Sequence, residues 1–488
     1  MHDTTADAGW RFDNSYARLP AALFERSTPV PVRTPALVIL NEPLAAELGL
    51  DAAALRDAAA AFAGNAVPSG AEPIAQAYAG HQFGHFTNLG DGRAILLGEQ
   101  LGPTGRRDIQ LKGAGRTRYS RGGDGRAALG PMLREYVISE GMHALGIPTT
   151  RSLAVATTGE AVLRNAPLPG AVLTRVAASH IRVGTFQFAA AIEDRPALTA
   201  LLDHAIARHD PELPAGDDRT LAFLTAVVER QAALVARWML VGFVHGVMNT
   251  DNMAVSGETI DYGPCAFLDA YDPATVFSSI DQHGRYAYAN QPAIAHWNLA
   301  RLAESLVPLA SGPEEAAVER LREVLATFPA RYERHHLAGA RAKLGLAAEE
   351  PGDGDLFAAL LRRMHEARAD FTGTFAGLAR LAGGTAEPDG DGCGPASGDW
   401  LAAWRSRLGR EPGGPEAAAA WLRRANPEVI PRNHRVEEAL VAAEAGDLGP
   451  VRLLLAAIRD PFVATPENEP YRGGPPPGCG PYRTFCGT

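Results

Sequence analysis

One stretch of the chain places a side-chain amide and two carboxylates close together, a set of groups that suits a nucleotide bound with a divalent metal ion. In HGVMNTDNMAVSGETIDYG, residues 245–263, Asn252 and Asp261 offer oxygen ligands of the kind that Mg²⁺ prefers, and Asp251 lies beside them. Transfer of a phosphate group also needs cations aimed at the phosphate oxygens and a group that orients the nucleophile. The stretch therefore predicts a nucleotide-transfer site with Asn252 and Asp261 as metal ligands.

A lysine and a glutamate closer to the N-terminus complete the pattern. Lys112 ends the expected strand DIQLKGAG, and Glu135 lies in the expected helix LREYVISEG. In the protein kinase fold, a strand lysine is held against the ATP phosphates by a glutamate on the next helix. Lys112 and Glu135 fit that arrangement, although two unrelated surface charges would give the same sequence pattern.

The order of residues 245–263 resembles the kinase catalytic loop and the metal-binding aspartate that follows it, with one departure. If His245 is aligned with the kinase His-Arg-Asp motif, Asn252 falls on the metal-binding asparagine, but Val247 stands in place of the catalytic aspartate. The missing base argues against ordinary phosphoryl transfer to a hydroxyl, and Asp251 is the nearest replacement. The alternative interpretation is an N-capped turn followed by an Asp-Tyr-Gly loop.

Small and cationic residues that could contact phosphates occur in three other stretches. Glycine lets the backbone approach an anion, and paired guanidinium groups suit terminal phosphates or pyrophosphate. The sequence has no GxxxxGK[ST] motif and no strand-GxGxxG-helix context, so neither a P-loop nor a dinucleotide-binding fold is indicated. Ordinary Gly-rich turns and solvated arginines are the alternative. The candidate nucleotide contacts are Gly90, Gly92 and Arg93 in LGDGRA, Asp124 and Gly125, and Arg175 and Arg182 in VLTRVAASHIRVG.

The elements expected to position these residues change from strands to helices along the chain. An apolar run at 94–97 and alternation at 109–111 predict antiparallel strands joined by hairpin turns, and helical spacing follows at 132–146. Short strands are expected at 147–163 and 172–179. Beyond about residue 185 the pattern is mainly helical, with later helical stretches at 298–309, 316–325, 358–378, 417–424 and 436–457.

This order predicts an α+β chain with a bilobal, protein kinase-like fold, in which a smaller strand-rich N-lobe precedes a larger helical C-lobe. A chain of 488 residues is longer than one hydrophobic core usually supports. We expect an N-terminal extension at residues 1–75, the N-lobe at 76–185 and the C-lobe, with the catalytic and metal-binding loops, at 186–382. A C-terminal helical extension is expected at 383–470 and a flexible cysteine-containing tail at 471–488. A flexible loop is also expected at 383–399.

Composition limits the class of protein. Hydrophobic residues make up 46% of the chain and charged residues 21%, as in soluble globular proteins. The formal charge of −10 gives no basic surface for nucleic acid, because backbone binders concentrate Lys and Arg. No apolar run is long enough to cross a membrane, and the opening MHDTTADAGW is unlike a signal peptide. We therefore expect a cytoplasmic bacterial protein without nucleic-acid or membrane partners.

Several long phrases of the sequence resemble the selenoprotein O family. They span about residues 75 to 435 and include YAGHQFGHFTNLGDGRA, DIQLKGAGRTRYSRGGDGRAALGPMLREYVISEGMHALGIPTTRSLA, VLTRVAASHIRVGTFQF, GFVHGVMNTDNMAVSGETIDYGPCAFLDAYDP and NPEVIPRNHRVEEAL. The resemblance implies a kinase-like fold in which ATP binds in the orientation opposite to that in kinases. The α-phosphate would then face the acceptor, and pyrophosphate would leave.

The activity implied by the resemblance is protein adenylylation. AMP would move from ATP to Ser, Thr or Tyr hydroxyls of proteins, with the chain itself among the candidate acceptors. UMP transfer from UTP with Mn²⁺ would use the same phosphate and metal ligands. A conventional kinase, which transfers the γ-phosphate, and a pseudoenzyme that binds ATP without turnover stay open as alternatives.

The resemblance also gives each candidate residue a role. Lys112 would pair with Glu135 and contact phosphate, Asp251 would accept a proton, and Asn252 and Asp261 would bind Mg²⁺ or Mn²⁺, with Asp261 also contacting the nucleotide. The other nucleotide contacts would be Gly90, Gly92, Arg93, Asp124, Gly125, Arg175 and Arg182.

The four cysteines, Cys265, Cys393, Cys479 and Cys486, show no spacing suited to zinc. Free thiols are the default in a reducing compartment. Many members of the resembled family outside bacteria carry selenocysteine near the C-terminus, and this chain has Cys486 there. A disulfide between Cys265 and Cys486 could hold the tail near the active site under oxidation, and two free thiols are the alternative.

Overall fold

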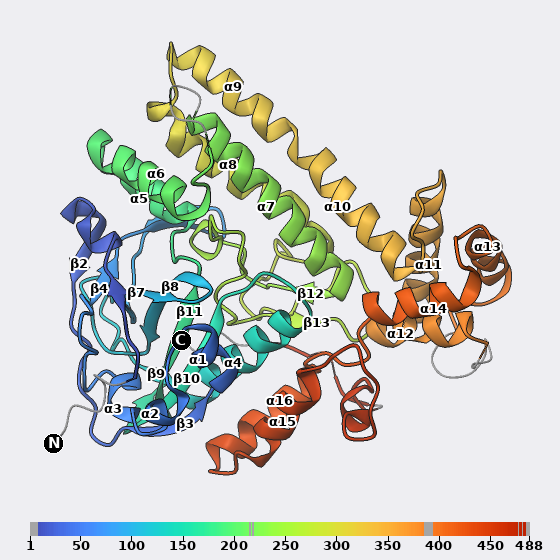
Figure 1. Ribbon diagram of the computed structural model, residues 1–488, viewed down its shortest axis with the longest axis horizontal. Coiled ribbons are helices and arrows are strands. Elements are labelled where there is room, and N and C mark those ends of the chain that lie inside the picture. Colours follow the sequence, from blue (N-terminus) through green and yellow to red (C-terminus); the bar gives the residue numbers. More distant parts are fainter. Residues whose placement is uncertain are drawn as a thin grey trace.

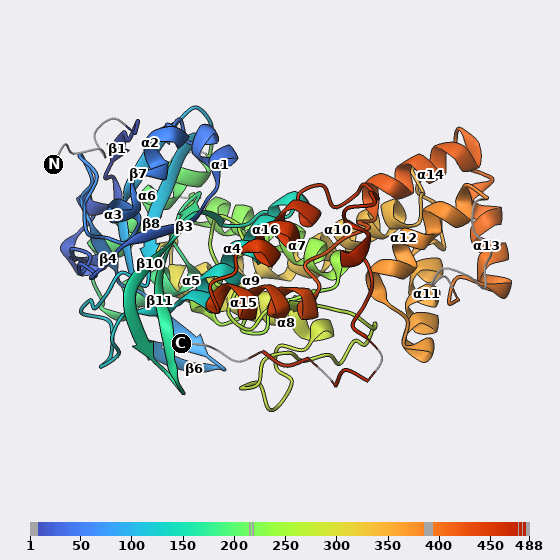
Figure 2. The ribbon, with the colours of Figure 1, turned by 90° about the horizontal axis from the view of Figure 1, so that it is seen from below.

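Most strands lie at one end of the molecule, and helices predominate in the rest (Figures 1 and 2). The computed structural model describes residues 8–213, 216, 219–384, 394–476, 478–480 and 482–484. Residues 385–393, which form much of the loop expected at 383–399, lie outside the described residues, and so do Cys393 and Cys486.

One antiparallel sheet, nine-stranded in the described part of the chain, forms the strand-rich end. Its strands are β1 (Phe12–Asp13), β2 (Phe24–Arg26), β3 (Ala36–Leu40), β4 (Ile74–Gln76), β7 (Ala94–Gly102), β8 (Gly105–Lys112), β9 (Ala127–Ala128), β10 (Arg151–Leu163) and β11 (Pro167–Ala177). The order along the sheet is β2-β4-β7-β8-β11-β10-β3, with β1 paired to β7 and β9 paired to β11. The strands predicted at 94–97 and 109–111 are confirmed as the β7–β8 hairpin. The sheet also takes strands from the first 75 residues.

The short strands predicted at 147–163 prove to be one long strand. β10 has 13 residues and pairs along its length with β11, with irregular register between Ser152 and Ala154 and between Thr157 and Ala161. Gly159 lies in the second irregular segment with a φ of +69°. Polar and glycine residues at this bulge interrupt the apolar alternation, so the sequence pattern suggests separate strands where the backbone continues.

Helices form most of the remaining regular structure of the described chain. Those near the sheet are α1 (Glu42–Glu47), α2 (Ala52–Arg56), α3 (Ala59–Phe62), α4 (Leu129–Ala144), α5 (Val183–Ala191) and α6 (Arg195–His209). The helical part comprises α7 (Arg219–Val241), α8 (Gln291–Leu306), α9 (Glu314–Ala326), α10 (Phe328–Lys343), α11 (Asp353–Ala367), α12 (Phe371–Ala382), α13 (Gly398–Leu408), α14 (Gly414–Ala425), α15 (Asn433–Glu444) and α16 (Gly449–Ile458). In Figures 1 and 2, α11–α14 lie at the end far from the sheet.

Two of the predicted helical stretches were too long. The stretch 358–378 divides into α11 and α12, because Arg368 adopts a left-handed conformation with φ +50° and Asp370 caps α12 by accepting a hydrogen bond from Gly373 N. The stretch 436–457 divides into α15 and α16 at Gly446, whose φ is +95°. Helices α10 and α13 were not predicted, and α10 has Pro329 in its first turn, where proline is tolerated.

The sheet has two chemically different faces. Ile109 and Leu111 of β8 point into an apolar core shared with α1, α2 and α3. The intervening residues Gln110 and Lys112 point to the opposite face, and Arg175 of β11 lies directly across from Gln110 in the register. Two cations from neighbouring strands therefore share one face of the sheet, near its centre.

Helix α4 covers this face and is almost entirely buried. Met132, Leu133, Tyr136 and Val137 pack into the main core, as expected for a helix between a sheet and other helices. Glu135, also on α4, is only 3% exposed. A carboxylate buried to this extent must be paired, so α4 brings a negative charge to the two cations of the sheet.

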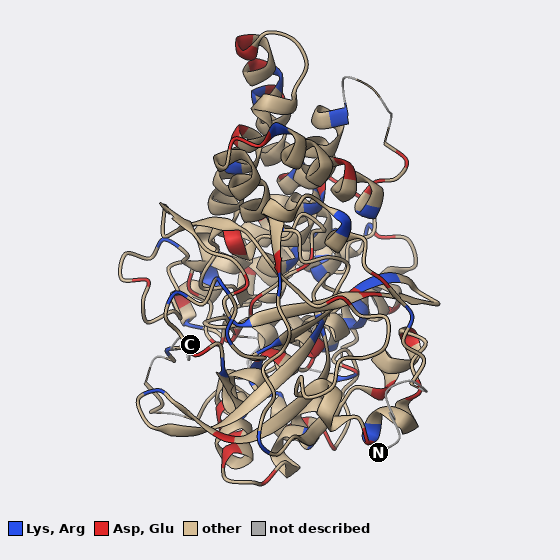
Figure 3. Cartoon of the chain, turned by 90° about the vertical axis from the view of Figure 1, so that its left-hand side faces the viewer, with Lys and Arg blue, Asp and Glu red and all other residues tan. Residues whose placement is uncertain are grey.

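Charged residues of both signs are intermixed on the side of the molecule that faces the viewer in Figure 3. In the view of Figure 3, Lys and Arg segments alternate with Asp and Glu segments on the face that is seen. No helix in the described ranges is both long enough and apolar enough to span a lipid bilayer.

The chain has two lysines, Lys112 and Lys343, and both are buried. Lys343 ends α10, and its Nζ lies 4.2 Å from the centre of the Phe375 ring of α12. Burial lowers the pKa of Lys343 from 10.5 to about 7. The folded protein therefore binds this proton more weakly than the unfolded chain does.

We expect the stability of Lys343→Met to depend less on pH than that of the unchanged protein. Because the folded pKa is depressed, the unfolded state binds more protons between about pH 7 and about pH 10, and the contribution of Lys343 to the free energy of unfolding rises with pH across that window. Urea unfolding at about pH 6 and about pH 9 measures this change. The advantage of the variant should be largest at the lower pH.

The exposed cation variant Arg423→Met is the matched control and should show the same pH dependence as the unchanged protein. If Lys343→Met and Arg423→Met behave alike, Lys343 is not held as a depressed base.

Candidate active site

A cavity of about 490 Å³ lies where the sheet, a hairpin and a polar turn meet. The hairpin consists of β5 (Ala79–Gln82) and β6 (His85–Asn88), and the turn is the 3₁₀ helix η3 (Thr250–Asn252), between β12 (Phe243–Val244) and β13 (Ala266–Phe267). The structure brings the predicted nucleotide and metal residues together on its walls: Gly90, Gly92, Arg93, Lys112, Asp124, Gly125, Arg175, Arg182, Asp251, Asn252 and Asp261.

Lys112 and Arg175 bind the same two carboxylates. Lys112 Nζ lies 2.6 Å from Glu135 Oε2 and 2.7 Å from Asp261 Oδ1. Arg175 Nη2 lies 2.7 Å from Glu135 Oε1 and 2.7 Å from Asp261 Oδ1. Glu135 lies outside the cavity lining and reaches the site through these pairs, so the predicted Lys112–Glu135 contact is present as half of a four-membered cluster.

Burial and charge act in opposite directions on this cluster. Burial raises the pKa of Glu135, but the charges of Arg175 and Lys112 outweigh it and hold the pKa below its usual value. For Lys112, burial and the neighbouring Arg175 together lower the pKa despite the two carboxylates. Both residues therefore depend on their partners to stay charged.

Asp261 is the point at which the cations converge. Arg182 Nη1 adds a third contact, 3.3 Å from Asp261 Oδ2. Although burial opposes ionisation, Lys112, Arg175 and Arg182 lower the pKa of Asp261 well below its usual value. The residue has a φ of +65°, a left-handed conformation that a non-glycine side chain adopts at some cost. The lining of the cavity as a whole contains seven Lys and Arg side chains and four Asp side chains, a positive balance suited to phosphate.

Arg182 links this cluster to the turn η3. It stands just before α5, and its Nη1 donates a hydrogen bond to the main-chain oxygen of Asp251 at 2.9 Å. Its guanidinium also lies over the ring of Tyr78, 4.5 Å from the ring centre. The same side chain therefore positions Asp251 and completes the cation cluster at Asp261.

The Asp251 carboxyl group is buried and only partly satisfied. Its Oδ1 has no hydrogen-bond partner among the described residues, and burial raises the pKa of Asp251 to about 6. The β5–β6 hairpin presses on the turn, since His81 N donates to Thr250 Oγ1 at 2.7 Å. A Cβ atom on Gly80 would lie 2.1 Å from Asp251 Oδ1, so only glycine leaves room for the carboxylate.

Asn252 and Asp261 have the donor chemistry for a magnesium or manganese ion. Asn252 Nδ2 donates to Val247 O at 3.0 Å, and no hydrogen bond to its Oδ1 occurs among the described residues. Both side chains line the cavity, and no cluster of three His, Cys, Asp or Glu side chains suited to a metal occurs in the described part of the chain. Mg²⁺ commonly binds one or two protein oxygens and takes its other ligands from phosphates and water. The residues present fit that kind of site.

The glycines at the rim are required by close packing. A Cβ atom on Gly90 would lie 2.4 Å from the Tyr119 ring, and one on Gly92 would lie 2.7 Å from Tyr119 O. The φ of Gly90 is +120°. Asp124 stands at the rim, where it pairs with Arg164 at 3.0 Å. The turn at residues 90–93 therefore packs closely against the loop that contains Tyr119, and both of its glycines line the cavity.

Comparison with known proteins places the chain in a family. A family profile described as "Protein adenylyltransferase SelO" matches residues 9–459. The chain belongs to this family. Similar proteins named "Protein nucleotidyltransferase YdiU" include those of Geobacillus kaustophilus (59% identical; 99% of this chain and 100% of the relative), Brevibacillus brevis (59%; 99% and 99%) and Rhizobium etli (59%; 99% and 98%). The resemblance seen in the sequence is confirmed, and the chain is a nucleotidyltransferase.

Sequence reasoning did not identify Asp91 as a site residue of this SelO-family member, although it lies between Gly90 and Gly92, two of the predicted nucleotide contacts. It is 1% exposed, accepts hydrogen bonds from Gln76 N at 3.1 Å and Gln110 Nε2 at 3.2 Å, and lies 3.8 Å from Arg182. Burial raises the pKa of Asp91 to about 6. The sequence signal that could have identified Asp91 is a carboxylate inside a Gly-rich turn. Its contact with Arg182 indicates that Asp91 positions this arginine.

His245 has a structural role in the loop that precedes Asp251. Its Nε2 contacts Ile260 O at 2.9 Å, its ring packs against Trp238 and Phe243, and burial lowers its pKa. The main-chain N of His245 donates to Gln291 Oε1 at 3.0 Å. The histidine therefore holds the polar loop in shape and does not line the cavity.

The C-terminal segment lies against the loop that carries Asp261, even without a disulfide in the described chain. Thr484 Oγ1 donates to Pro264 O at 2.9 Å, and Arg134 donates to both Cys265 O (2.6 Å) and Tyr482 Oη (2.9 Å). Cys265 is fully buried, and burial raises the pKa of its thiol to about 12. Its thiolate is therefore scarce at neutral pH.

Replacing Gly80 by alanine should disable catalysis by displacing Asp251. The new Cβ would lie within 2.8 Å of Asp251 Oδ1, Cγ and Cβ, so the whole side chain must move. A displacement of about 1 Å in a reacting group can lower a rate about a hundredfold. The rate of nucleotide transfer from α-labelled ATP measures this effect.

Gly383→Ala is the matched control, because its Cβ would lie 3.4 Å from the nearest atom, an ordinary contact. Nucleotide transfer by Gly80→Ala at the rate of the control would show that the position of Asp251 is unimportant.

Proposed function

We propose that the chain is a protein adenylyltransferase that moves AMP from ATP to Ser, Thr or Tyr hydroxyls of proteins and releases pyrophosphate. The main support is the convergence of Lys112, Arg175 and Arg182 on Asp261, next to the Asp251 carboxylate. The relatives are named protein nucleotidyltransferases, and the family is described as protein adenylyltransferase. Such a transfer needs cations that stabilise the phosphates and a base that orients the attacking hydroxyl, and a cation cluster beside a buried carboxylate can supply both.

On this proposal the scaffold is kinase-like and bilobal. A lysine at the end of β8 pairs with a glutamate on α4, and an asparagine and an aspartate follow on loops after the long helix α7, in the order that kinases use. The N-lobe would comprise residues 76–185 and the C-lobe residues 186–382. The flanking segments 1–75, 383–470 and 471–488 would be extensions, of which the first supplies strands and the last contacts the Asp261 loop.

The position of the cations favours ATP in the orientation opposite to that in kinases. Lys112, Arg175 and Arg182 are each 5% exposed or less, so the most negatively charged end of ATP would enter deepest. With the β- and γ-phosphates against these cations, the α-phosphate would lie toward η3 and Asp251. Gly90, Gly92, Arg93, Asp124 and Gly125 would contact the nucleotide at the rim.

Each residue then has a defined part in the reaction. Asp251 would accept the proton of the attacking hydroxyl, whose oxygen forms a bond to the α-phosphorus while the bond to the β-phosphate oxygen breaks. Asn252 and Asp261 would hold Mg²⁺ or Mn²⁺, which when bound neutralises charge on the phosphates. Arg182 would keep Asp251 in place through its main-chain oxygen. Val247 cannot accept a proton, consistent with a base at Asp251 instead.

The same groups would also accept UTP with Mn²⁺, giving UMP transfer, and the chain itself would be one acceptor. Cytoplasmic location in a bacterium is part of the proposal. A conventional kinase and an ATP-binding pseudoenzyme are the competing functions, and the position of the label separates them.

The deciding experiment supplies the purified chain with ATP labelled at the α- or the γ-phosphate, together with Mg²⁺ or Mn²⁺ and a bacterial lysate. We expect protein to be labelled only from the α position. Asp251→Asn, which keeps the shape of the side chain and removes the base, and Lys112→Met should each lower the rate about a hundredfold or more.

Asp57→Asn, an exposed carboxylate changed in the same way, is the control and should leave the rate unchanged. Label from the γ position would make the protein a kinase. No label from either position, with ATP still bound, would make it a binding protein.

We further propose the pair Cys265 and Cys486 as a redox link, supported by the contact between the tail at Thr484 and Pro264. Two thiols would lose two protons and two electrons to hydrogen peroxide, giving one disulfide and water. Because Cys265 is buried, we expect linkage only after the loop opens, and hence slowly. Non-reducing peptide mapping after peroxide treatment should find the linked peptide, and Cys479→Ser should not affect it. If the linked peptide is not found, Cys265 and Cys486 are free thiols.

A further inference from the structure

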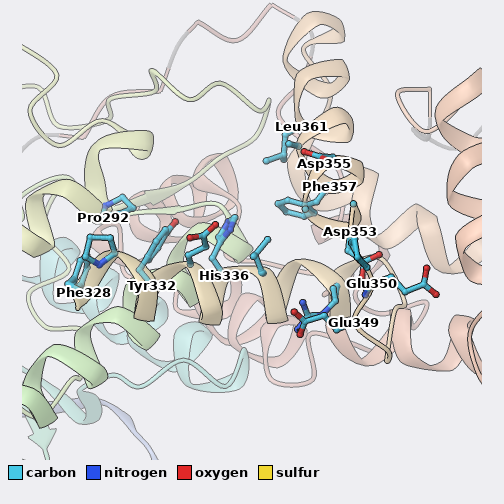
Figure 4. Close-up of a pocket in the computed structure, with 18 of the residues that line it drawn as sticks. Pro292, Phe328, Tyr332, His336, Glu349, Glu350, Asp353, Asp355, Phe357 and Leu361 are labelled. Atoms are coloured by element: carbon cyan, nitrogen blue, oxygen red, sulfur yellow. Dashed lines mark hydrogen bonds and ion pairs between the residues drawn. The ribbon is translucent and has the colours of Figure 1, made fainter. Parts of the chain in front are cut away.

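A second cavity, about 1040 Å³ in volume and therefore larger than the nucleotide cavity, lies in the helical part of the molecule. It is a groove between the start of α8, the length of α10 and the first turns of α11. Figure 4 shows Phe328, Tyr332 and His336 in sequence along α10, with Phe357 and Leu361 facing them from α11. We call this surface the α10 groove.

A row of stacked rings forms the floor of the α10 groove. Phe328 stacks on His296 with 5.2 Å between ring centres, and Tyr332 stacks on Phe328 at 6.3 Å and on His336 at 5.5 Å. Phe357 closes the row with its edge toward His336 at 5.7 Å. Residues four apart on a helix share one face, so the rings form a continuous strip. Phe328 and Phe357 are buried in it, and Tyr332, His336 and His296 are partly exposed at its surface. Such a strip binds apolar side chains and guanidinium groups.

The edge of the α10 groove is acidic. Its lining contains five carboxylates and one arginine, Arg341, which pairs with Glu349 at 3.0 Å. Arginines outside the lining neutralise two more, since Arg410 lies 2.8 Å from Glu350 and Arg407 lies 2.7 Å from Asp353. Glu333 and Asp355 are exposed and form no ion pair among the described residues. Carboxylates beside aromatic rings attract cationic side chains and repel acidic ones. The carboxylates are Glu333, Glu349, Glu350, Asp353 and Asp355.

Helix α8, whose start lines the α10 groove, is hydrogen-bonded to the loop that carries Asp251, and Asn298 of this helix donates to Met248 O at 3.0 Å. Gln291 Oε1 accepts a hydrogen bond from His245 N at 3.0 Å, and Gln291 Nε2 donates to Phe243 O at 2.9 Å, which ties the start of α8 to the loop that carries Asp251. The next residue, Pro292, lines the α10 groove. One wall of the α10 groove and the loop that carries Asp251 are therefore held together by buried hydrogen bonds.

We propose that the α10 groove is the docking site for protein substrates, and that it binds an extended basic segment in which Arg or Lys stands next to an aromatic or aliphatic side chain. The proposal rests on the proposed function, because it supplies the protein specificity that a hydroxyl group alone cannot give. The rings would hold the apolar side chain or stack on a guanidinium group, and Glu333 and Asp355 would bind the charges. The attachment is remote from the nucleotide, so it contributes to binding and leaves the chemical step unchanged.

The test first selects peptides from a displayed random library on the immobilised chain without nucleotide. We expect the selected peptides to carry Arg or Lys beside an apolar residue. Synthetic copies should bind about tenfold more weakly to the double variant Glu333→Lys/Asp355→Lys and to Tyr332→Ala. Glu315→Lys/Glu323→Lys makes the same change at two exposed positions of α9 outside the groove, and should bind like the unchanged protein.

A second measurement connects docking to catalysis. A selected peptide extended by a serine should accept label from α-labelled ATP, and the Glu333→Lys/Asp355→Lys variant should raise its KM about tenfold at unchanged kcat. Both substituted residues are exposed, so the thermal midpoint should not change, which shows that the fold is kept.

Several results would overturn the proposal. They are the selection of no peptide, selection of peptides without basic residues, or equal binding to the double variant and the α9 control. A change in oligomeric state of the double variant without peptide would assign the groove to a second copy of the chain instead. Docking that follows the expected pattern without α-label transfer would leave the docking site standing and reject the adenylyltransferase function.

Discussion

Three buried cations meet at Asp261, and the arrangement of the active site depends on that contact. Lys112 comes from β8, Arg175 from β11 and Arg182 from the start of α5, while Glu135 arrives on α4. Burial of each charge is unfavourable without its partners, so strands, helix and loop must come together as one assembly. The result is a cation-rich recess that a polyphosphate and a divalent metal can complete, with the Asp251 turn held beside it by Arg182.

Segments distant in the sequence hold the Asp261 loop in place. Arg134 donates to Gly263 O and Cys265 O, just after Asp261. Farther along the loop, Arg432 pairs with Asp269 at 3.1 Å and with Asp370 at 2.7 Å, which fastens the start of α15 to the segment after β13. Helix α4 and the start of α15 therefore both stabilise the segment that follows Asp261. Damage to the start of α15 should reach the active site through this segment, without any contact to nucleotide.

The two cavities have different characters, which suits a division of labour on our proposals. The cavity assigned to the nucleotide is the smaller and is rich in cations, and its chemistry would be the same for every hydroxyl acceptor. The α10 groove is larger, aromatic and acidic, and α8, which forms one wall of it, is hydrogen-bonded to the loop that carries Asp251 through Gln291 and Asn298. Selection of protein partners and transfer of the nucleotide would thus be made by separate surfaces. Such separation lets binding change without altering the barrier to the chemical step.

Much of the site could be predicted from the sequence alone, because its residue types are chemically specific: Lys112 ends an amphipathic strand, and Asn252 and Asp261 stand in a polar loop with oxygen atoms that suit a divalent metal. The β7–β8 hairpin and α4 followed from local periodicity. Other features depended on contacts between distant segments. The sequence could not show that Arg175 shares Glu135 and Asp261 with Lys112, that Asp91 is buried against Arg182, or that Gly80 makes room for Asp251. Nor could it show the α10 groove, since α10 has few apolar residues and its rings form a surface only when α8 and α11 pack beside them. Residue type and spacing determined which chemistry is available, whereas burial and the pairing of charges across segments, which exist only in the folded chain, decided how those groups are held.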